Sequence, residues 1–279
     1  MQRKGERPMN IKKMVALVVT GALAASLALF GCSSGDDGAK KDEGGSAPAT
    51  ESGYALINDG KLTVAASLDF PPFENLNGDT PEGFEVELMG LLAEEMGLEI
   101  NYLPSTKFDT IVPLIQTGGK ADVGVSGITI TDERLDQVDF TDAVCDVNQS
   151  ITVLKDSGVT DVAQLEGKKV GAQTGTTGYE WAAENIKDVE MVGFDEMTAV
   201  FLALQSGQID AIAVDLPVAN YYVKTAYTDC QVIKDIPTGE QYAIAVSKDS
   251  PELTKALNTA LKAVRENGKY DELAAKWLQ

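Results

Sequence analysis

The same order of secondary structure can be traced twice along this chain, and this repeat constrains the fold more than any other feature. Residues 61–125 and residues 168–214 each alternate short apolar runs with amphipathic stretches, in the order strand, helix, strand, helix, strand. Both copies contain the same four-residue pattern, in which an apolar residue, glutamine, a hydroxyl residue and glycine follow one another and an aspartate comes shortly after. The pattern lies at 115–118 with Asp122 in the first copy, and at 204–207 with Asp210 in the second. Two such runs predict an α/β protein of two lobes, each with a mostly parallel sheet flanked by helices.

Turn and capping residues mark the expected boundaries of the repeated elements. Gly83 and Gly97 bracket the first helix, 106–109 resembles a capping box ahead of the second, and Asp195 is expected to cap a later one. Pro113 should make the second helix irregular, because proline has no N–H to donate to the preceding turn. The expected strands are 61–66, 99–103, 121–125, 168–172, 189–194 and 209–214, and the expected helices are 83–97, 106–118, 179–186 and 195–207.

Two further strands and a C-terminal helical region complete the expected fold. Apolar runs at 149–154 and 242–247 are interpreted as a two-strand hinge that crosses between the lobes. Helices at 250–267 and 271–278 are expected to pack on the first lobe. The expected lobe boundaries are 54–144 with 244–279 for the first lobe, and 145–243 for the second. The cleft between the strand ends of the two lobes is then the expected ligand site.

The first 31 residues differ in composition from the rest of the chain. Five basic side chains precede an apolar run at 14–30, and Gly31 and Cys32 follow it. This order describes a secretory signal peptide at 1–31. The run is shorter than the ~20 residues of a spanning helix, which favours cleavage over an uncleaved transmembrane anchor. The end of the run resembles a bacterial lipobox, which implies a lipid on Cys32 and a place on the outer side of the cytoplasmic membrane. Residues 32–53 lack an apolar pattern and are expected to be a flexible tether.

Charge and composition narrow the classes of function. The net charge of −20 argues against nucleic-acid binding, because phosphate backbones would be repelled. The sequence has no histidine, which excludes histidine-based catalytic triads and the usual zinc sites, and neither metal nor cofactor is expected. Two cysteines remain beside Cys32. In an oxidising compartment, Cys145 and Cys230 either form a disulfide or stay as buried thiols.

The segment 120–142 carries the strongest functional pattern. An apolar run at 121–125 predicts a buried strand, and hydroxyl and glycine residues follow it before Arg134, the one basic residue between 121 and 142. A guanidinium holds a carboxylate through two parallel hydrogen bonds, and open α/β sheets bind ligands at the C-terminal ends of their strands. The alternative is a surface arginine in an acidic turn.

Two more patterns follow strands of the second copy. Residues 171–178 form a glycine- and threonine-rich loop ahead of a helix. The loop lacks the lysine of a P-loop and the spacing of a dinucleotide fingerprint, but free amides at a helix N-terminus attract an anion. Asp215 follows the apolar strand at 209–214 and precedes Leu216 and Pro217, where a carboxylate is either a helix N-cap or a ligand-binding group.

The motif around Arg134 resembles that of a known family. SGITITDER at 126–134, followed by VDFTD at 138–142, is similar to the motif of the solute-binding proteins of polar amino-acid ABC transporters, solute-binding family 3. The resemblance covers nearly all of residues 54–279. It implies a type II periplasmic-binding-protein-like fold and a ligand held between the lobes.

The resemblance also assigns roles to single residues. Arg134 would take the α-carboxylate of an amino acid, helped by Thr177 and Thr176, and Asp215 would take the α-ammonium group. Other matching positions are Phe70 and Phe108, which would stack on the ligand; Ser126, Gly127 and Thr129, which offer hydroxyl and backbone groups; and Ser67, Gln173 and Glu74, which fall near its side chain.

These matches imply a lipid-anchored, monomeric receptor that captures a polar amino acid outside the cell and delivers it to an ABC permease. A neutral or cationic ligand is favoured, because Arg134 is the only cation in the matching segments and is committed to the α-carboxylate. One alternative is an enzyme of the same fold, such as a cyclohexadienyl or arogenate dehydratase. No general acid can be assigned for it, since Glu74 and Glu240 are unplaced carboxylates. A second alternative is a sensory ligand-binding protein.

Overall fold

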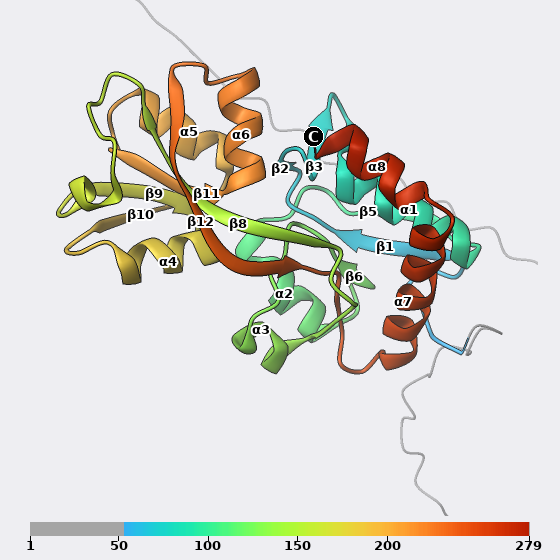
Figure 1. Cartoon of the computed structure of the whole chain (residues 1–279). Helices are drawn as coiled ribbons and strands as arrows, with labels where there is room; N and C mark the ends of the chain where they lie inside the picture. Colours follow the sequence, from blue (N-terminus) through green and yellow to red (C-terminus); the bar gives the residue numbers. More distant parts are fainter. Residues whose placement is uncertain (1–52, 279) are drawn as a thin grey trace, which may run out of the picture. The chain divides into compact units, whose positions relative to one another are not determined.

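A computed structural model of the protein describes residues 53–278, and these belong to one compact unit. Within them lie two five-stranded sheets and one three-stranded sheet, with helices against both large sheets (Figure 1). The predicted α/β class with two lobes is therefore confirmed. The predicted signal peptide at 1–31, the lipid on Cys32 and residues 32–52 of the tether lie outside the described residues.

The first large sheet has the strand order β5-β1-β6-β13-β7. Its strands β1 (Lys61–Ala65), β5 (Glu99–Tyr102) and β6 (Val123–Gly124) are parallel, as the first copy of the repeat predicted. β13 (Ala245–Val246) lies antiparallel between β6 and β7 (Asp139–Phe140). The chain therefore returns to the first lobe near its C-terminus.

The second large sheet has the strand order β10-β9-β11-β8-β12. β9 (Lys169–Gln173) is parallel to β10 (Glu190–Phe194) and β11 (Ala211–Asp215), as the second copy predicted. β8 (Cys145–Leu154) is antiparallel to both β11 and β12 (Cys230–Tyr242). Because Asp215 is the last residue of β11, its carboxylate lies at the C-terminal edge of the parallel strands.

The first lobe contains α1 (Phe84–Met96), α2 (Phe108–Thr117), α3 (Asp132–Gln137), α7 (Pro251–Glu266) and α8 (Lys269–Trp277). α1 begins at a position that only glycine fits. Gly83 has φ 131°, and a Cβ there would lie 2.3 Å from the carbonyl oxygen of Phe73. α7 and α8 pack on α1, as expected from the sequence: the rings of Phe84 and Tyr270 meet edge to face with centroids 5.7 Å apart (Figure 1).

The second lobe contains α4 (Thr177–Asn185), α5 (Met197–Gln205), α6 (Leu216–Thr225) and the 3-10 turn Val162–Leu165. Two predicted caps are wrong. α2 follows Lys107 without a side-chain cap, because the Thr106 hydroxyl donates to the Pro104 carbonyl oxygen instead. Asp195 does not cap α5, because its carboxylate pairs with Lys107.

The crossing between the lobes lies closer to the first sheet than predicted. Residues 149–154 belong to β8 inside the second sheet. The two crossing segments meet where the Thr141 N–H donates to the Ile244 carbonyl oxygen at 3.0 Å, and the Val144 N–H to the Tyr242 carbonyl oxygen at 2.7 Å. The interpretation of 149–154 as a hinge is therefore wrong, whereas one crossing does fall within 242–247. We propose that the first lobe comprises residues 54–144 and 244–279, and that the second comprises residues 145–243.

The possible disulfide between Cys145 and Cys230 is absent, and both side chains are free thiols. Cys145 pairs with Tyr242 at one end of the β8–β12 ribbon, and Cys230 pairs with Leu154 at the other. Ten-residue β8 separates the two pairs. At about 3.3 Å per residue the thiols are on the order of 30 Å apart, far beyond the Cα separation of a disulfide.

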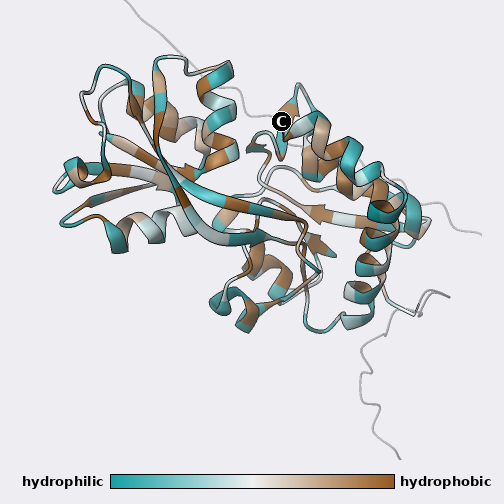
Figure 2. Ribbon diagram, viewed as in Figure 1, coloured by the Kyte–Doolittle hydropathy of each residue, from teal (hydrophilic) through white to brown (hydrophobic). Residues whose placement is uncertain are grey.

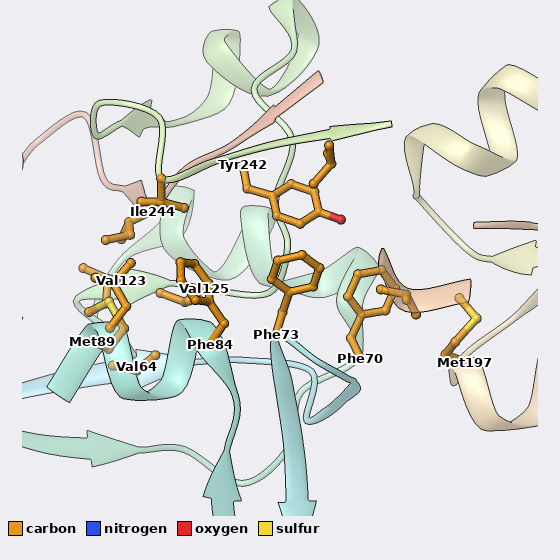
Figure 3. Packing of buried hydrophobic residues seen from close by; sticks show 14 of the residues in the cluster. Val64, Phe70, Phe73, Phe84, Met89, Val123, Val125, Met197, Tyr242 and Ile244 are labelled. Atoms are coloured by element: carbon orange, nitrogen blue, oxygen red, sulfur yellow. The ribbon is translucent and has the colours of Figure 1, made fainter. Parts of the chain in front are cut away.

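Residues 67–81, where no strand or helix was expected, contain most of the three-stranded sheet β2 (Asp69–Phe70), β3 (Glu74–Asn77) and β4 (Thr80–Glu82). Its aromatic side chains enter the core: Phe73 is fully buried and its ring lies 5.0 Å from that of Tyr242 (Figure 3). Hydrophobic residues lie along the central strands, and the helices that cover these strands have both hydrophobic and hydrophilic residues (Figure 2). Within the described residues, no helix is long and apolar enough to cross a membrane.

Candidate functional site

Arg134 lies in the first turn of α3, and its guanidinium group contacts both lobes. The Thr131 hydroxyl caps this helix and accepts from the Arg134 N–H at 3.2 Å. Nη1 of Arg134 donates to the Thr129 carbonyl oxygen at 2.8 Å, and Nη2 donates to the Gly175 carbonyl oxygen at 2.9 Å. Thr129 follows the third strand of the first repeat, and Gly175 belongs to the glycine-rich loop of the second. One side chain therefore joins the two repeats.

A cavity of about 300 Å³ opens beside Arg134. The Phe108 ring forms one wall, with its centroid 5.4 Å from Arg134 Cζ, and Gly175 and Glu180 line the cavity from the second lobe. Among the described residues that line it, Arg134 is the only basic one. Burial lowers the pKa of Arg134 from its usual value, and the carboxylates of Glu180, Asp215 and Glu240 oppose that shift. The volume is at the lower end of the range for small-molecule pockets.

Asp215 is a buried carboxylate held from the neighbouring strand. Its partner in the β8–β11 register is Gln149, whose Nε2 donates to Asp215 Oδ1 at 2.9 Å. Burial, followed by repulsion from Glu240, raises the pKa of Asp215 to about 7. Asp215 occupies the N-cap position of α6, but among the described residues its side chain makes no capping bond to that helix. The Tyr242 hydroxyl opposes the rise in the pKa of Asp215, so the carboxylate has polar neighbours on both β8 and β12.

One carboxylate oxygen of Glu240 accepts hydrogen bonds from side chains of both lobes. Its Oε2 accepts from the Thr177 hydroxyl at 2.6 Å, from the Thr129 hydroxyl at 3.1 Å and from Gln149 Nε2 at 3.2 Å. Gln149 Nε2 also lies 3.2 Å from Thr177 Oγ1. The network thus runs from Thr129, whose carbonyl oxygen binds Arg134, through Glu240 and Gln149 to Asp215. Two of the predicted site residues, Thr129 and Thr177, are brought together by it.

Thr176 and Gln173 have local structural partners. Thr176 is the N-cap of α4: its hydroxyl accepts from the Tyr179 N–H at 3.2 Å and donates to the Gln173 carbonyl oxygen at 2.8 Å. Gln173 Nε2 donates to the Asp195 carbonyl oxygen at 3.1 Å. Both side chains are buried, so they shape the loop that presents Gly175 and Thr177.

A second polar group lies in the first lobe behind the loop that follows β6. The Ser126 hydroxyl donates to Glu74 Oε1 at 3.1 Å, the Gly127 N–H donates to Glu85 Oε2 at 2.7 Å, and the Ser67 N–H donates to the Ser126 hydroxyl oxygen. Burial raises the pKa of Glu74 well above its usual value, and repulsion from Glu85 adds to the shift. Burial also raises the pKa of Glu85, against the Gly127 hydrogen bond. Both shifts favour the protonated form of these two carboxyl groups.

Phe70 and Phe108, both predicted to stack on a ligand, have different surroundings. Phe108 lines the cavity beside Arg134. Phe70 is 4% exposed, and its ring stacks on Phe73 with centroids 6.4 Å apart (Figure 3). Gly127 allows this packing, because it has φ 55° and a Cβ there would lie 3.0 Å from Phe70 Cε1.

Three residues of the site were not predicted to bind: Gln149, Glu85 and Glu240. Gln149 lies in a run whose pattern indicated only a strand, and the Glu85 carboxylate belongs to an amphipathic helix. Glu240 stands in a segment without a clear period. The strand pairing, which places β8 between β11 and β12, is what brings Gln149 and Glu240 close to Asp215. No group of histidine, cysteine or acidic residues suited to a metal ion occurs among the described residues.

The family model for bacterial extracellular solute-binding proteins, family 3, matches residues 62–279. The chain belongs to this family. The match covers both repeats except residue 61, and it includes the C-terminal helices. The solute-binding protein therefore shares its fold class and its two-lobed plan with that family, as the motif around Arg134 implied.

Relatives with the same plan are named as binding proteins and not as enzymes. A probable histidine-binding protein of Neisseria gonorrhoeae is 34% identical over 277 residues, covering 96% of both chains. The arginine-binding extracellular protein ArtP of Bacillus subtilis is 34% identical over 272 residues, covering 96% of this chain and 98% of ArtP. A mutant of ArgBP from T. maritima superposes with a TM-score of 0.74 at 37% identity, covering 78% of this chain and 95% of ArgBP.

Proposed function

We propose that this solute-binding protein captures a free polar amino acid between its lobes and delivers it to the permease of an ABC transporter. Arg134 and Thr177 would hold the α-carboxylate, and Asp215 would hold the α-ammonium group. Phe108 would cover the aliphatic part of the ligand. Thr129, Ser126, Gly127 and Phe70 would supply further contacts or support, as would Thr176, Ser67, Gln173 and Glu74.

One observation carries this proposal: a guanidinium and a carboxylate from opposite lobes belong to the same hydrogen-bond network. Arg134 already reaches the second lobe at Gly175, and Asp215 is linked through Gln149 and Glu240 to Thr129 of the first lobe. A zwitterionic amino acid has a carboxylate to pair with Arg134 and an ammonium group to pair with Asp215. Binding it would tie the two lobes together.

The remaining charges favour a cationic side chain over an acidic one. After one amino acid has paired with Arg134 and Asp215, Glu240 and Glu180 remain as negative groups near the cavity. An acidic side chain would meet these carboxylates without a cation to pair with, which costs several kcal/mol in a desolvated site. The relatives named for arginine and histidine agree with this preference.

The N-terminal region supports delivery at the membrane surface. We propose that residues 1–31 direct export and are removed, and that a lipid on Cys32 anchors the protein. Residues 33–53 would then tether the folded part, which would act as a monomer. The family's description as extracellular agrees with export of the chain.

A thermal-shift screen of the purified protein against the amino acids tests the proposal. A ligand that binds only the folded state raises the midpoint by mass action, with about 2.7 kcal/mol at a hundredfold excess over Kd. Arginine, lysine or histidine should give the largest shift. Aspartate or glutamate as the best ligand would contradict the proposed charge preference, and no shift with any amino acid would contradict the function.

A further inference from the structure

Asp69 makes a second contact between the lobes, away from the cavity beside Arg134. It lies in β2 of the first lobe, and its Oδ2 accepts from the N–H of Met197 at 2.6 Å. Met197 is the first residue of α5 in the second lobe. The Met197 side chain is buried in the same hydrophobic cluster as Phe70, the neighbour of Asp69 (Figure 3). At this place the two lobes are therefore joined by a polar contact and by an apolar contact.

Helix α5 depends on this contact for its N-terminal cap. The first N–H groups of a helix have no partner within the helix and need an acceptor from outside. Glu196 occupies the N-cap position, but within the described residues its side chain makes no capping bond. Asp69 supplies the missing acceptor from the other lobe, and its negative charge is also favourable at the positive end of the helix. The Ser67 hydroxyl donates to Asp69 Oδ1 at 3.0 Å and orients the carboxylate.

Two other bonds between the lobes surround Asp69. The Tyr222 hydroxyl of α6 donates to the Asp69 carbonyl oxygen at 3.0 Å. Lys107, just before α2, pairs with Asp195, just before α5. The Lys107 and Asp195 side chains are each 60% exposed, so this ion pair contributes little. The bonds to Asp69 are the better shielded part of the contact, since Met197 and Tyr222 are buried.

We infer that Asp69 is a positioning residue that latches the closed arrangement of the lobes by capping α5 across the cleft. Opening would break the bonds from Met197 and Tyr222 and leave the first turn of α5 without an acceptor. The latch would therefore raise the population of the closed form without contacting the ligand. Because apparent affinity scales with the competent population, losing the latch weakens every ligand by the same factor. The inference rests on the proposed function for its binding readout.

Asp69→Ala in the mature protein tests the latch by calorimetry and stopped-flow dissociation with arginine and lysine. Loss of a helix cap predicts an affinity about 2- to 30-fold weaker, through faster dissociation and with an unchanged ratio between the two ligands. Asp69→Asn keeps an acceptor oxygen and should recover part of the loss. Glu196→Ala removes a neighbouring carboxylate that repels Asp69 and makes no capping bond, so this control should bind no more weakly than wild type.

Small-angle scattering of the ligand-free proteins separates the latch from the function. The radius of gyration should be larger for Asp69→Ala than for wild type and Glu196→Ala. Equal radii, or wild-type affinity and dissociation rate in Asp69→Ala, would overturn the latch. A changed ratio between arginine and lysine would instead place Asp69 against the ligand and also overturn it. If wild type binds no amino acid of the thermal-shift screen, the proposed function fails, while the scattering comparison still decides on the latch.

Discussion

At the scale of single residues, the site is governed by how few partners its buried carboxylates have. Asp215 receives one amide hydrogen bond from Gln149 and faces the negative charge of Glu240. Burial first, and the charge of Glu240 second, raise its pKa to about 7 by disfavouring the ionised form, against an opposing effect of the Tyr242 hydroxyl. An ammonium group would relieve both effects. The same imbalance makes ligand binding sensitive to pH.

We expect affinity to fall as pH decreases below 7. The ammonium group requires the ionised form of Asp215, and a carboxyl group with a raised pKa becomes protonated as pH falls through that value. Kd should therefore rise by up to about tenfold per pH unit between pH 7 and pH 5, measured by calorimetry with arginine. Glu240→Gln removes the neighbouring charge and should move the midpoint to lower pH. A constant Kd from pH 5 to pH 8 would contradict this account of Asp215.

At the scale of secondary structure elements, the sequence predicted the two repeats and their parallel strands well. Strands such as β1 and β9 are apolar runs bounded by turns, so local pattern and final structure agree. The sequence-based prediction was wrong where pairing between distant segments determines the secondary structure. β12 is a mixed sequence that becomes a strand because β8 lies beside it, and Asp69 caps a helix 128 residues away. Sequence motifs pointed to Arg134, Thr177 and Asp215, whose binding roles are proposals. The linking residues Gln149 and Glu240 could not be predicted in this way.

Gly127, in the loop after β6, packs directly against aromatic side chains of the core. Gly127→Ala forces a side chain into the left-handed region and against Phe70 and Tyr242, whose nearest atoms lie 3.0 and 3.1 Å from the new Cβ. Strain and overpacking together should lower the free energy of unfolding by about 2–4 kcal/mol in urea titrations. Gly78→Ala is the matched control: its φ is 62° and no atom lies within 4 Å of its Cβ, so only strain applies. Equal losses in the two variants would refute the packing role of Gly127.

The two thiols at opposite ends of the β8–β12 ribbon should stay reduced and slow to react. Thiol counting under denaturing, non-reducing conditions should find both Cys145 and Cys230 free in the processed protein. In the native state, burial raises the pKa of Cys145 to about 12 and that of Cys230 to about 11, so little thiolate is present at pH 8. Iodoacetamide should therefore label the folded protein much more slowly than the unfolded one. A protein without free thiols at these positions would contradict the strand register.

At the scale of the whole molecule, charge and topology point to the same class of ligand. A net charge of −20 attracts cations toward the protein and repels acidic solutes. We propose that the chain passes from one lobe to the other through the paired segments at Thr141–Val144 and Tyr242–Ile244, and that the lobes move about them. Arg134 and the Asp69 contact join the lobes at separate places. The first would respond to ligand, and the second would set how readily the lobes stay closed.

The central claim is that one amino acid joins Arg134 of the first lobe to Asp215 of the second. Titration calorimetry of wild type, Arg134→Ala and Asp215→Ala with the best ligand of the screen tests it most directly. Each substitution leaves a ligand charge without its buried partner, at about 2–5 kcal/mol, so Kd should rise about 30-fold to several thousand-fold. Asp249→Asn, at an exposed carboxylate, should bind as wild type. If either variant is folded and retains near wild-type affinity, the ligand is not held by this pair of charges.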